Sequence, residues 1–492
     1  MSEIKTLMHQ SSHFFAGQIL IMAAGFISFP ILTRIFSVGD YGILSIITTT
    51  LLVVGAVAKL GLPGWIVQFY AEFKSKKLLN IFRSTMFIGS FAWASIIALL
   101  FYGVSELFQS RFLDKKLSAL LPLISVLIFT HCASITLTSF LRAEQRTKLY
   151  NLVAIISRYG SLAVSILIVL FIVRGLYGFY FGQIIMGAMI VLLLTYKFIK
   201  NQRISFNDFS TRVFKDSMKF GFPIAGAELG HLILNYADRY LVQLYLGSIS
   251  LGLYTAGYNL ATYVTEMIMY PINYAMIPIY MNLLVNRGEE KTREFFEKTF
   301  RYFLLIMFPI VFGFIAVGED LIRILATSKY LEAYPILPYV VIGQSIYACS
   351  LILNNGLFIK KKTYIVTFVI FAASLVNIGL NAVLIPRFGI VGAAQATLIS
   401  NTFYTVVITY FAFKEFKFKI DYPHILLYVF VAAAMYLVIG LIDRGSPFGN
   451  LVTKIPVGVV FYVIGILVLD TDVKGAIVRL ISRSGTPKFP VH

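Results

Sequence analysis

Long apolar runs follow one another along the whole chain, and only short polar segments separate them. Each run has about 20 residues, the length that an α-helix needs to cross the hydrocarbon core of a bilayer. Because a bilayer offers no hydrogen-bond partners to the backbone, such runs predict helices rather than open strands. The predicted class is an all-α polytopic membrane protein with about fourteen transmembrane helices. The expected spans are residues 14–35, 43–68, 85–104, 117–140, 150–172, 176–198, 219–245, 252–281, 300–317, 336–358, 364–385, 389–413, 424–442 and 451–469.

The composition favours the same class. Of the 492 residues, 58% are hydrophobic and 13% are charged. In soluble proteins roughly a quarter of all residues are charged. The two cysteines, Cys132 and Cys349, both fall in apolar spans, which excludes a disulfide framework. The segment before the first span contains no small-residue cleavage site, so we expect a retained first helix.

The net charge of +19 has two interpretations, nucleic-acid binding or membrane topology. With the N-terminus placed in the cytoplasm, the inner segments hold roughly three times as many Lys and Arg residues as the outer segments. This asymmetry favours the membrane interpretation, with no nucleic-acid partner. It predicts that both the N-terminus and the C-terminus are cytoplasmic.

Short turn sequences recur in the two halves of the chain, at offsets of about 210 to 216 residues. We therefore expect two parallel six-helix repeats around a central cavity, over residues 1–199 and 200–418, with an extra helix pair and a cytoplasmic tail over 419–492. Rocking of the halves would open the cavity to each side in turn. The alternative is convergence, since Gly and Ser suit any tight turn. The matched segments are SVGDYGILS (37–45) with SISLGLYT (248–255), GLYGFYFGQ (175–183) with GIVGAAQAT (389–397), and RTKLY (146–150) with KKTYI (361–365).

The turns PILTRIFSVGDYGILSI (30–46), LGSISLGLYTAGYNLA (246–261) and LIPRFGIVGAAQATLIS (384–400) also resemble those of polysaccharide-unit flippases of the Wzx type. These belong to the multidrug/oligosaccharidyl-lipid/polysaccharide exporter superfamily, and the resemblance covers nearly the whole chain. It implies export of undecaprenyl-diphosphate-linked sugar repeat units to the outer leaflet of the bacterial cytoplasmic membrane, for O-antigen (lipopolysaccharide) or capsule assembly. It further implies a monomer that works beside a polysaccharide polymerase and a chain-length regulator.

A diphosphate head group needs cationic partners, and Arg can bind phosphate in a bidentate manner. Lys59, Arg158 and Arg239 lie within spans, and Arg34 lies at the outer end of the first span. Together they would form a ladder of substrate-binding cations from the inner to the outer leaflet. For Arg34 and Arg239 the alternative is that the side chain extends to the outer interface.

Three carboxylates fall within spans, Glu228, Asp238 and Glu266. A carboxylate in a low-dielectric setting can carry a proton or bind a cation, so these residues are candidates for ion coupling. The alternative is a structural role in ion pairs between helices. The sequence contains no P-loop and no metal-ligand cluster, so we expect no cofactor, no bound metal and no ATP hydrolysis.

Two other function classes stay open. One is a multidrug exporter, or an exporter of another lipid-linked precursor, from the same superfamily; the last two spans and the excess of cations argue against a drug extruder. The other is a membrane glycosyltransferase or polymerase, which generally needs a sizeable outer domain. The longest outer segment, about residues 318–335, is short for that purpose, so we expect a transporter and not an enzyme.

Overall fold

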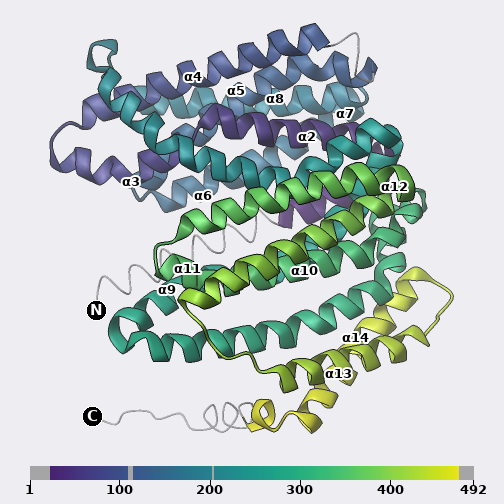
Figure 1. Cartoon of the computed structure of the whole chain (residues 1–492). Coiled ribbons are helices and arrows are strands. Elements are labelled where there is room, and N and C mark those ends of the chain that lie inside the picture. Colours follow the sequence, from purple (N-terminus) through teal and green to yellow (C-terminus); the bar gives the residue numbers. More distant parts are fainter. Residues whose placement is uncertain (1–22, 109–114, 202–203, 476–492) are drawn as a thin grey trace, which may run out of the picture. The chain divides into compact units, whose positions relative to one another are not determined.

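The computed structural model describes residues 23–108, 115–201 and 204–475 (Figure 1), so residues 14–22 of the predicted first span and the tail from 476 lie outside it. Within these ranges the chain is helical with short connections and no strand, which confirms the all-α class. After a helix over Ala23–Ile35, the elements are α2 (Val38–Lys59), α3 (Leu62–Ser75), α4 (Leu79–Phe108), α5 (Lys115–Ala143), α6 (Thr147–Ile155), η1 (Ile156–Gly160), α7 (Ser161–Phe171), α8 (Leu176–Asn201), η2 (Phe206–Asp208), α9 (Thr211–Leu321), η3 (Ile322–Ala326), η4 (Ser328–Ile336), α10 (Leu337–Leu353), α11 (Asn355–Ile359), α12 (Thr363–Glu415), α13 (Tyr422–Gly440) and α14 (Pro447–Leu469).

Ten helices in the described ranges are long and apolar enough to cross a membrane. The longest, α9, has 111 residues, and a straight helix of that length would reach about 165 Å, several times the thickness of a bilayer. Gly247 (φ +80°) and Gly288 (φ +77°) interrupt it, and Gly389 (φ +60°) interrupts α12. These glycines coincide with turns expected between spans, so the chain reverses there with almost no loop. The total of fourteen spans stays a prediction.

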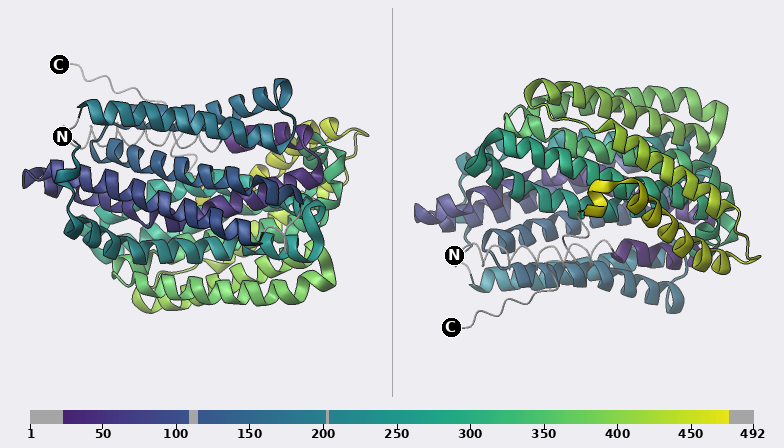
Figure 2. Two further views of the ribbon diagram at one scale, coloured as in Figure 1. Left: turned by 90° about the horizontal axis from the view of Figure 1, so that it is seen from above. Right: turned by 90° about the horizontal axis from the view of Figure 1, so that it is seen from below.

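The helices of the described ranges group into two compact units, one within residues 23–255 and 370–390 and the other within residues 256–369 and 391–475. In the first unit α5 packs between α4 and α8, and α7 packs on α8 (Figures 1 and 2). In the second unit α13 and α14 run side by side. The predicted repeats, with boundaries at 199 and 418, rest on similar turn sequences and not on contacts between helices. They stay a prediction.

Two of the matched turn segments contact each other reciprocally within the first unit. A β-carbon on Gly42 would lie 2.0 Å from the Ser248 carbonyl oxygen, and one on Gly252 would lie 1.9 Å from the Val38 carbonyl oxygen. The Thr255 hydroxyl donates a 2.8 Å hydrogen bond to the Ser45 hydroxyl, 210 positions away. The same spacing separates Gly42 from Gly252 and Val38 from Ser248. Two equivalent segments that face each other across a local two-fold axis make contacts of this kind.

In the second unit, Arg301 of α9 ties the helix pair α13–α14 to α9. Its guanidinium donates to the Asp470 carboxylate at 2.8 Å and to the Tyr428 hydroxyl at 2.9 Å. Tyr428 in turn donates to Asp470 at 2.7 Å. Burial opposes ionisation of Asp470, but hydrogen bonds from the Val473 amide, Tyr428 and Arg301 outweigh it, and the pKa of Asp470 lies below its ordinary value.

The reciprocal contact predicts that Gly42 accepts no side chain. Gly42→Ala places a carbon against a backbone carbonyl that cannot turn aside, and it should lower the stability of the protein by about 1–3 kcal/mol. Gly226→Ala is the matched control, because no atom lies within 4 Å of the added carbon. Thermal unfolding of both variants in detergent measures the difference, and equal melting temperatures would contradict the close approach.

The ion pair between Arg301 and Asp470 predicts that the stability of the folded protein falls in acid. A carboxylate with a lowered pKa in the folded state stabilises the fold above its ordinary pKa, near 4, and this stabilisation is lost as the pH falls through the lowered value. Asp470→Asn should therefore be less stable than the wild type at pH 6, by about 1–3 kcal/mol, and should lose less stability between pH 5 and 3. The control is Asp216→Asn, at an exposed position. If the stability of the wild type and of Asp470→Asn changed with pH in parallel, the ion pair between Arg301 and Asp470 would contribute nothing to the pH dependence of stability.

Candidate functional site

Lys59 is the last residue of α2 and stands directly before a break in the predicted second span. Leu60 (φ 42°) and Gly61 (φ 64°) adopt left-handed backbone conformations, and α3 begins at Leu62. A left-handed leucine is strained and persists only where its surroundings impose it. Gly221 of α9 supplies that support, because a β-carbon on Gly221 would lie 1.9 Å from the Leu60 carbonyl oxygen. Backbone packing therefore holds the break in place.

The Lys59 ammonium forms an ion pair with Glu228 of α9. The Nζ–Oε1 distance is 2.6 Å, and the two side chains are 23% and 33% exposed. Exposed ion pairs stabilise proteins by about 0–1 kcal/mol in water, so this pair adds little to the fold by itself. The pair is notable for its position, because the sequence places both of its charged side chains inside predicted membrane spans.

Arg158 lies on η1, a single π-helical turn between α6 and α7. Such turns change the direction of side chains within a helix, and they occur frequently at functional sites. The Arg158 side chain is exposed and has no hydrogen-bond or ion-pair partner among the residues that the structure describes. It is the least compensated of the predicted cations.

Lys59, Arg158 and His131 of α5 belong to one neighbourhood. The charges of Lys59 and Arg158 both act on the His131 side chain. The His131 ring also lies beside Gly55, one helical turn before Lys59. We call Lys59, His131, Arg158 and Glu228 the cation cluster.

All four members of the cation cluster are at least partly exposed. Charged side chains that face hydrocarbon are costly, so this surface must face water or an anionic group rather than lipid tails. The predicted cations Lys59 and Arg158 are thus brought together, and the predicted ion-coupling residue Glu228 lies with them as a partner of Lys59.

Asp238 and Arg239 are buried in the protein, whereas a ladder of substrate-binding cations requires side chains that the substrate can reach. Asp238 accepts hydrogen bonds from the Tyr254 hydroxyl and, at 2.8 Å, from the Arg239 amide. The Arg239 guanidinium lies 4.4 Å from the centre of the Tyr236 ring and donates to the Asn235 carbonyl at 3.1 Å. Both side chains are buried. These contacts describe a structural network, and the substrate and coupling roles of the two residues stay predictions.

Arg34 and Glu266 are not members of the cation cluster. Arg34 is exposed and donates to the Pro30 carbonyl at 2.7 Å, one turn earlier in its own helix. Glu266 is half-buried in the second unit and has no hydrogen-bond or ion-pair partner within the described ranges. The ion-coupling role of Glu266 stays a prediction.

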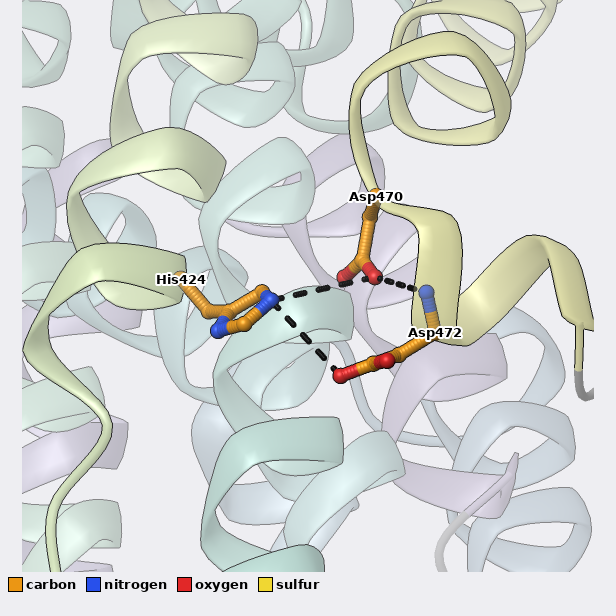
Figure 3. Close-up of side chains that lie close together, drawn as sticks. All are labelled: His424, Asp470 and Asp472. Carbon is orange, nitrogen blue, oxygen red and sulfur yellow. Dashed lines mark hydrogen bonds and ion pairs between the residues drawn. The ribbon is translucent and has the colours of Figure 1, made fainter.

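A second polar group, around Arg301, was not predicted from the sequence. His424, Asp470 and Asp472 place possible metal-ligand atoms within 4.8 Å of one another (Figure 3). The Arg301 guanidinium, however, lies 2.8 Å from Asp470 and 3.0 Å from Asp472. Because this fixed cation already neutralises the same carboxylates, the arrangement suits an ion-pair tie better than a metal centre.

An apolar groove of about 650 Å³ runs through the second unit, and the sequence did not predict it either. It is lined by α9, α13 and α14, among them Leu305, Ile310, Met435 and Gly458. The lining reaches from Lys454, near the start of α14, to Val473, beyond its end, so the groove follows the whole helix. Lys454 is paired with Asp320 at 3.3 Å. No periodicity in a single segment reveals a groove whose walls come from three helices.

The fold resembles that of a solved structure titled lipid II flippase MurJ, inward closed conformation. The TM-score is 0.78, and the match covers 94% of this chain and 99% of that one at 18% sequence identity. At this identity the likeness shows the fold alone.

Several curated proteins match in sequence, among them the following three. An uncharacterized membrane protein of Methanocaldococcus jannaschii is 26% identical over 61% of this chain and 60% of its own length. An uncharacterized membrane protein in the cps region of Klebsiella pneumoniae is 22% identical over 81% of this chain and 80% of its own. The succinoglycan biosynthesis transport protein ExoT of Rhizobium meliloti is 21% identical over 66% and 64%.

A family profile gives the assignment. The profile described as "Polysaccharide biosynthesis protein" matches residues 31–335, more than half of the chain. These residues contain the whole cation cluster and the reciprocal turn contact. The chain is thus a multi-pass membrane protein that belongs to the polysaccharide biosynthesis protein family.

Proposed function

We propose that this protein is a flippase that moves undecaprenyl-diphosphate-linked oligosaccharide repeat units from the inner to the outer leaflet of the bacterial cytoplasmic membrane. It works by alternating access, is coupled to an ion gradient, keeps both termini in the cytoplasm and is a transporter rather than an enzyme. The observation that carries the proposal is Arg158, an exposed guanidinium inside a predicted span with no partner among the described residues.

The chemistry of Arg158 suits a diphosphate. A guanidinium presents paired N–H donors that match two phosphate oxygens, and its charge persists at any physiological pH. Lys59 adds a second cation to the same neighbourhood, and its flexible stem lets the ammonium follow a moving anion. Sugar head groups alone would not need this excess of positive charge.

The apolar groove suits the other end of such a substrate. A polyprenyl chain is a long hydrocarbon that a transporter must accommodate while the head group crosses. The groove follows the length of α14, is lined almost entirely by apolar side chains and holds its one lysine in an ion pair with Asp320. Contact with an isoprenoid is the use that fits a lining of this composition.

The relatives support the same substrate class. The family concerns polysaccharide biosynthesis, the Klebsiella relative is named for a cps region, and the Rhizobium relative is named as a transport protein for succinoglycan biosynthesis. The structural relative is titled a lipid II flippase. The sequence relatives concern polysaccharide biosynthesis and transport, and a lipid-linked sugar is the substrate of that kind that fits the chemistry of the cation cluster.

Removal of the Arg158 guanidinium should stop export. Hydrogen bonds to charged groups contribute about 1.5–3 kcal/mol each, so Arg158→Ala should lower transport by about ten- to hundredfold, and Arg158→Lys should recover only part of it. Lys59→Ala should act in the same direction. Surface polysaccharide in a complemented deletion strain reports export, with membrane abundance measured in parallel and Arg174→Ala, at an exposed turn, as the control.

Full export by both alanine variants would contradict the proposal. Extrusion of cationic drugs without movement of the lipid by the wild-type protein would favour the multidrug alternative.

Energy coupling should depend on Glu266. Glu266→Gln keeps the shape of the side chain but cannot gain or lose the charge that an imposed gradient would act on. We expect proteoliposomes with this variant to bind the lipid normally and to lose the stimulation of transport by an imposed ion gradient. The control is Glu332→Gln, at an exposed position. An unchanged response to the gradient would make Glu266 structural.

A further inference from the structure

The ion pair between Lys59 and Glu228 joins segments that lie far apart in the sequence. Lys59 belongs to the first predicted repeat and Glu228 to the second, and the pair stands directly beside the break at Leu60 and Gly61. A transporter that rocks one half against the other must alter contacts of this kind in each cycle. The following inference rests on the proposed function.

The Glu228 carboxylate occupies the place beside Lys59 that a phosphate oxygen would take. Carboxylate and phosphate oxygens bind an ammonium with the same geometry, and the 2.6 Å contact leaves no room for both. We propose that Glu228 is an internal counter-ion that the diphosphate of the substrate displaces from Lys59. The exchange would break the ion pair between α9 and α2 whenever the substrate is bound.

The charges of the cation cluster support such an exchange. With neutral histidine, Lys59 and Arg158 face one carboxylate, so the cluster keeps an excess positive charge when the substrate is absent. A diphosphate carries more negative charge than a carboxylate and engages Arg158 as well, so it competes effectively for Lys59. In the empty protein Glu228 compensates Lys59, which would otherwise be a costly bare cation inside a predicted span.

The side chain of Lys59 can move although the backbone beside it is held in place. Helix α2 ends at Lys59, and the next residues depart from helical geometry. The Lys59 side chain can therefore change partner without disturbing hydrogen bonds of a continuous helix. Gly221 packs on this break from α9, seven positions before Glu228, so the counter-ion and the support of the break belong to the same helix.

The test is the affinity of purified protein in nanodiscs for undecaprenyl diphosphate. Without its internal competitor, Glu228→Gln should bind this lipid about two- to fivefold tighter than the wild type and should transport it more slowly. Lys59→Gln should weaken binding, and Lys59→Gln with Glu228→Gln should bind no tighter than Lys59→Gln alone. The matched control is Glu72→Gln, which breaks an exposed Lys–Glu pair of the same 2.6 Å distance.

The outcomes separate the inference from the proposed function. If the wild-type protein neither binds nor moves the lipid, the proposed function fails. If the wild type binds and moves the lipid but Glu228→Gln binds equally or more weakly, only the counter-ion role fails. If Glu228→Gln instead leaves binding unchanged and abolishes the response to an ion gradient, Glu228 is a coupling residue. If Glu228→Gln does not fold, Glu228→Asp replaces it in the same test. The Asp side chain is one methylene shorter, so we expect a smaller gain in affinity.

Discussion

A peptide group inside a bilayer has no water to bind, so the chain itself must satisfy each N–H and C=O within the hydrocarbon layer. This constraint explains why the described ranges are helical with short connections. The break after Lys59 is covered by the backbone at Gly221, and the start of α2 is covered by the backbone around Gly252. Glycine lies at these points because only a residue without a side chain lets two backbones approach so closely.

The same constraint sorts the charged side chains. Asp238 and Arg239 are buried, and hydrogen bonds and the Tyr236 ring satisfy them. Lys59 and Glu228 compensate each other at a partly exposed position. Arg158 and Glu266 have no such compensation among the described residues. A charge without compensation is costly inside a membrane, and under the proposed function an anionic head group and a coupling ion would be the partners of these two side chains.

The sequence predicts the all-helical class and apolar helices of membrane-crossing length, because the bilayer imposes a length and a composition on each helix, independent of what the helix packs against. It also marks Lys59, Arg158 and Glu266, since a charge in an apolar run is visible without a structure. It does not show that Glu228 reaches Lys59, because that contact joins positions 169 residues apart. Nor does it show the burial of Arg239, which depends on neighbouring rings. Acids bracket the last two spans at Asp421 and Asp470, but only the fold brings Arg301 of α9 between them.

The hydrogen bond between Thr255 and Ser45 joins the two matched turn segments, and Gly42 and Gly252 stand one turn before it on their respective segments. In an α-helix each residue turns the chain by about 100°. A single insertion or deletion in either segment would therefore rotate one glycine and one hydroxyl away from their partners together. The lengths of these two segments, 210 positions apart, are thus linked. An insertion or deletion in one segment would keep the contacts only if the other segment changed in a matching way.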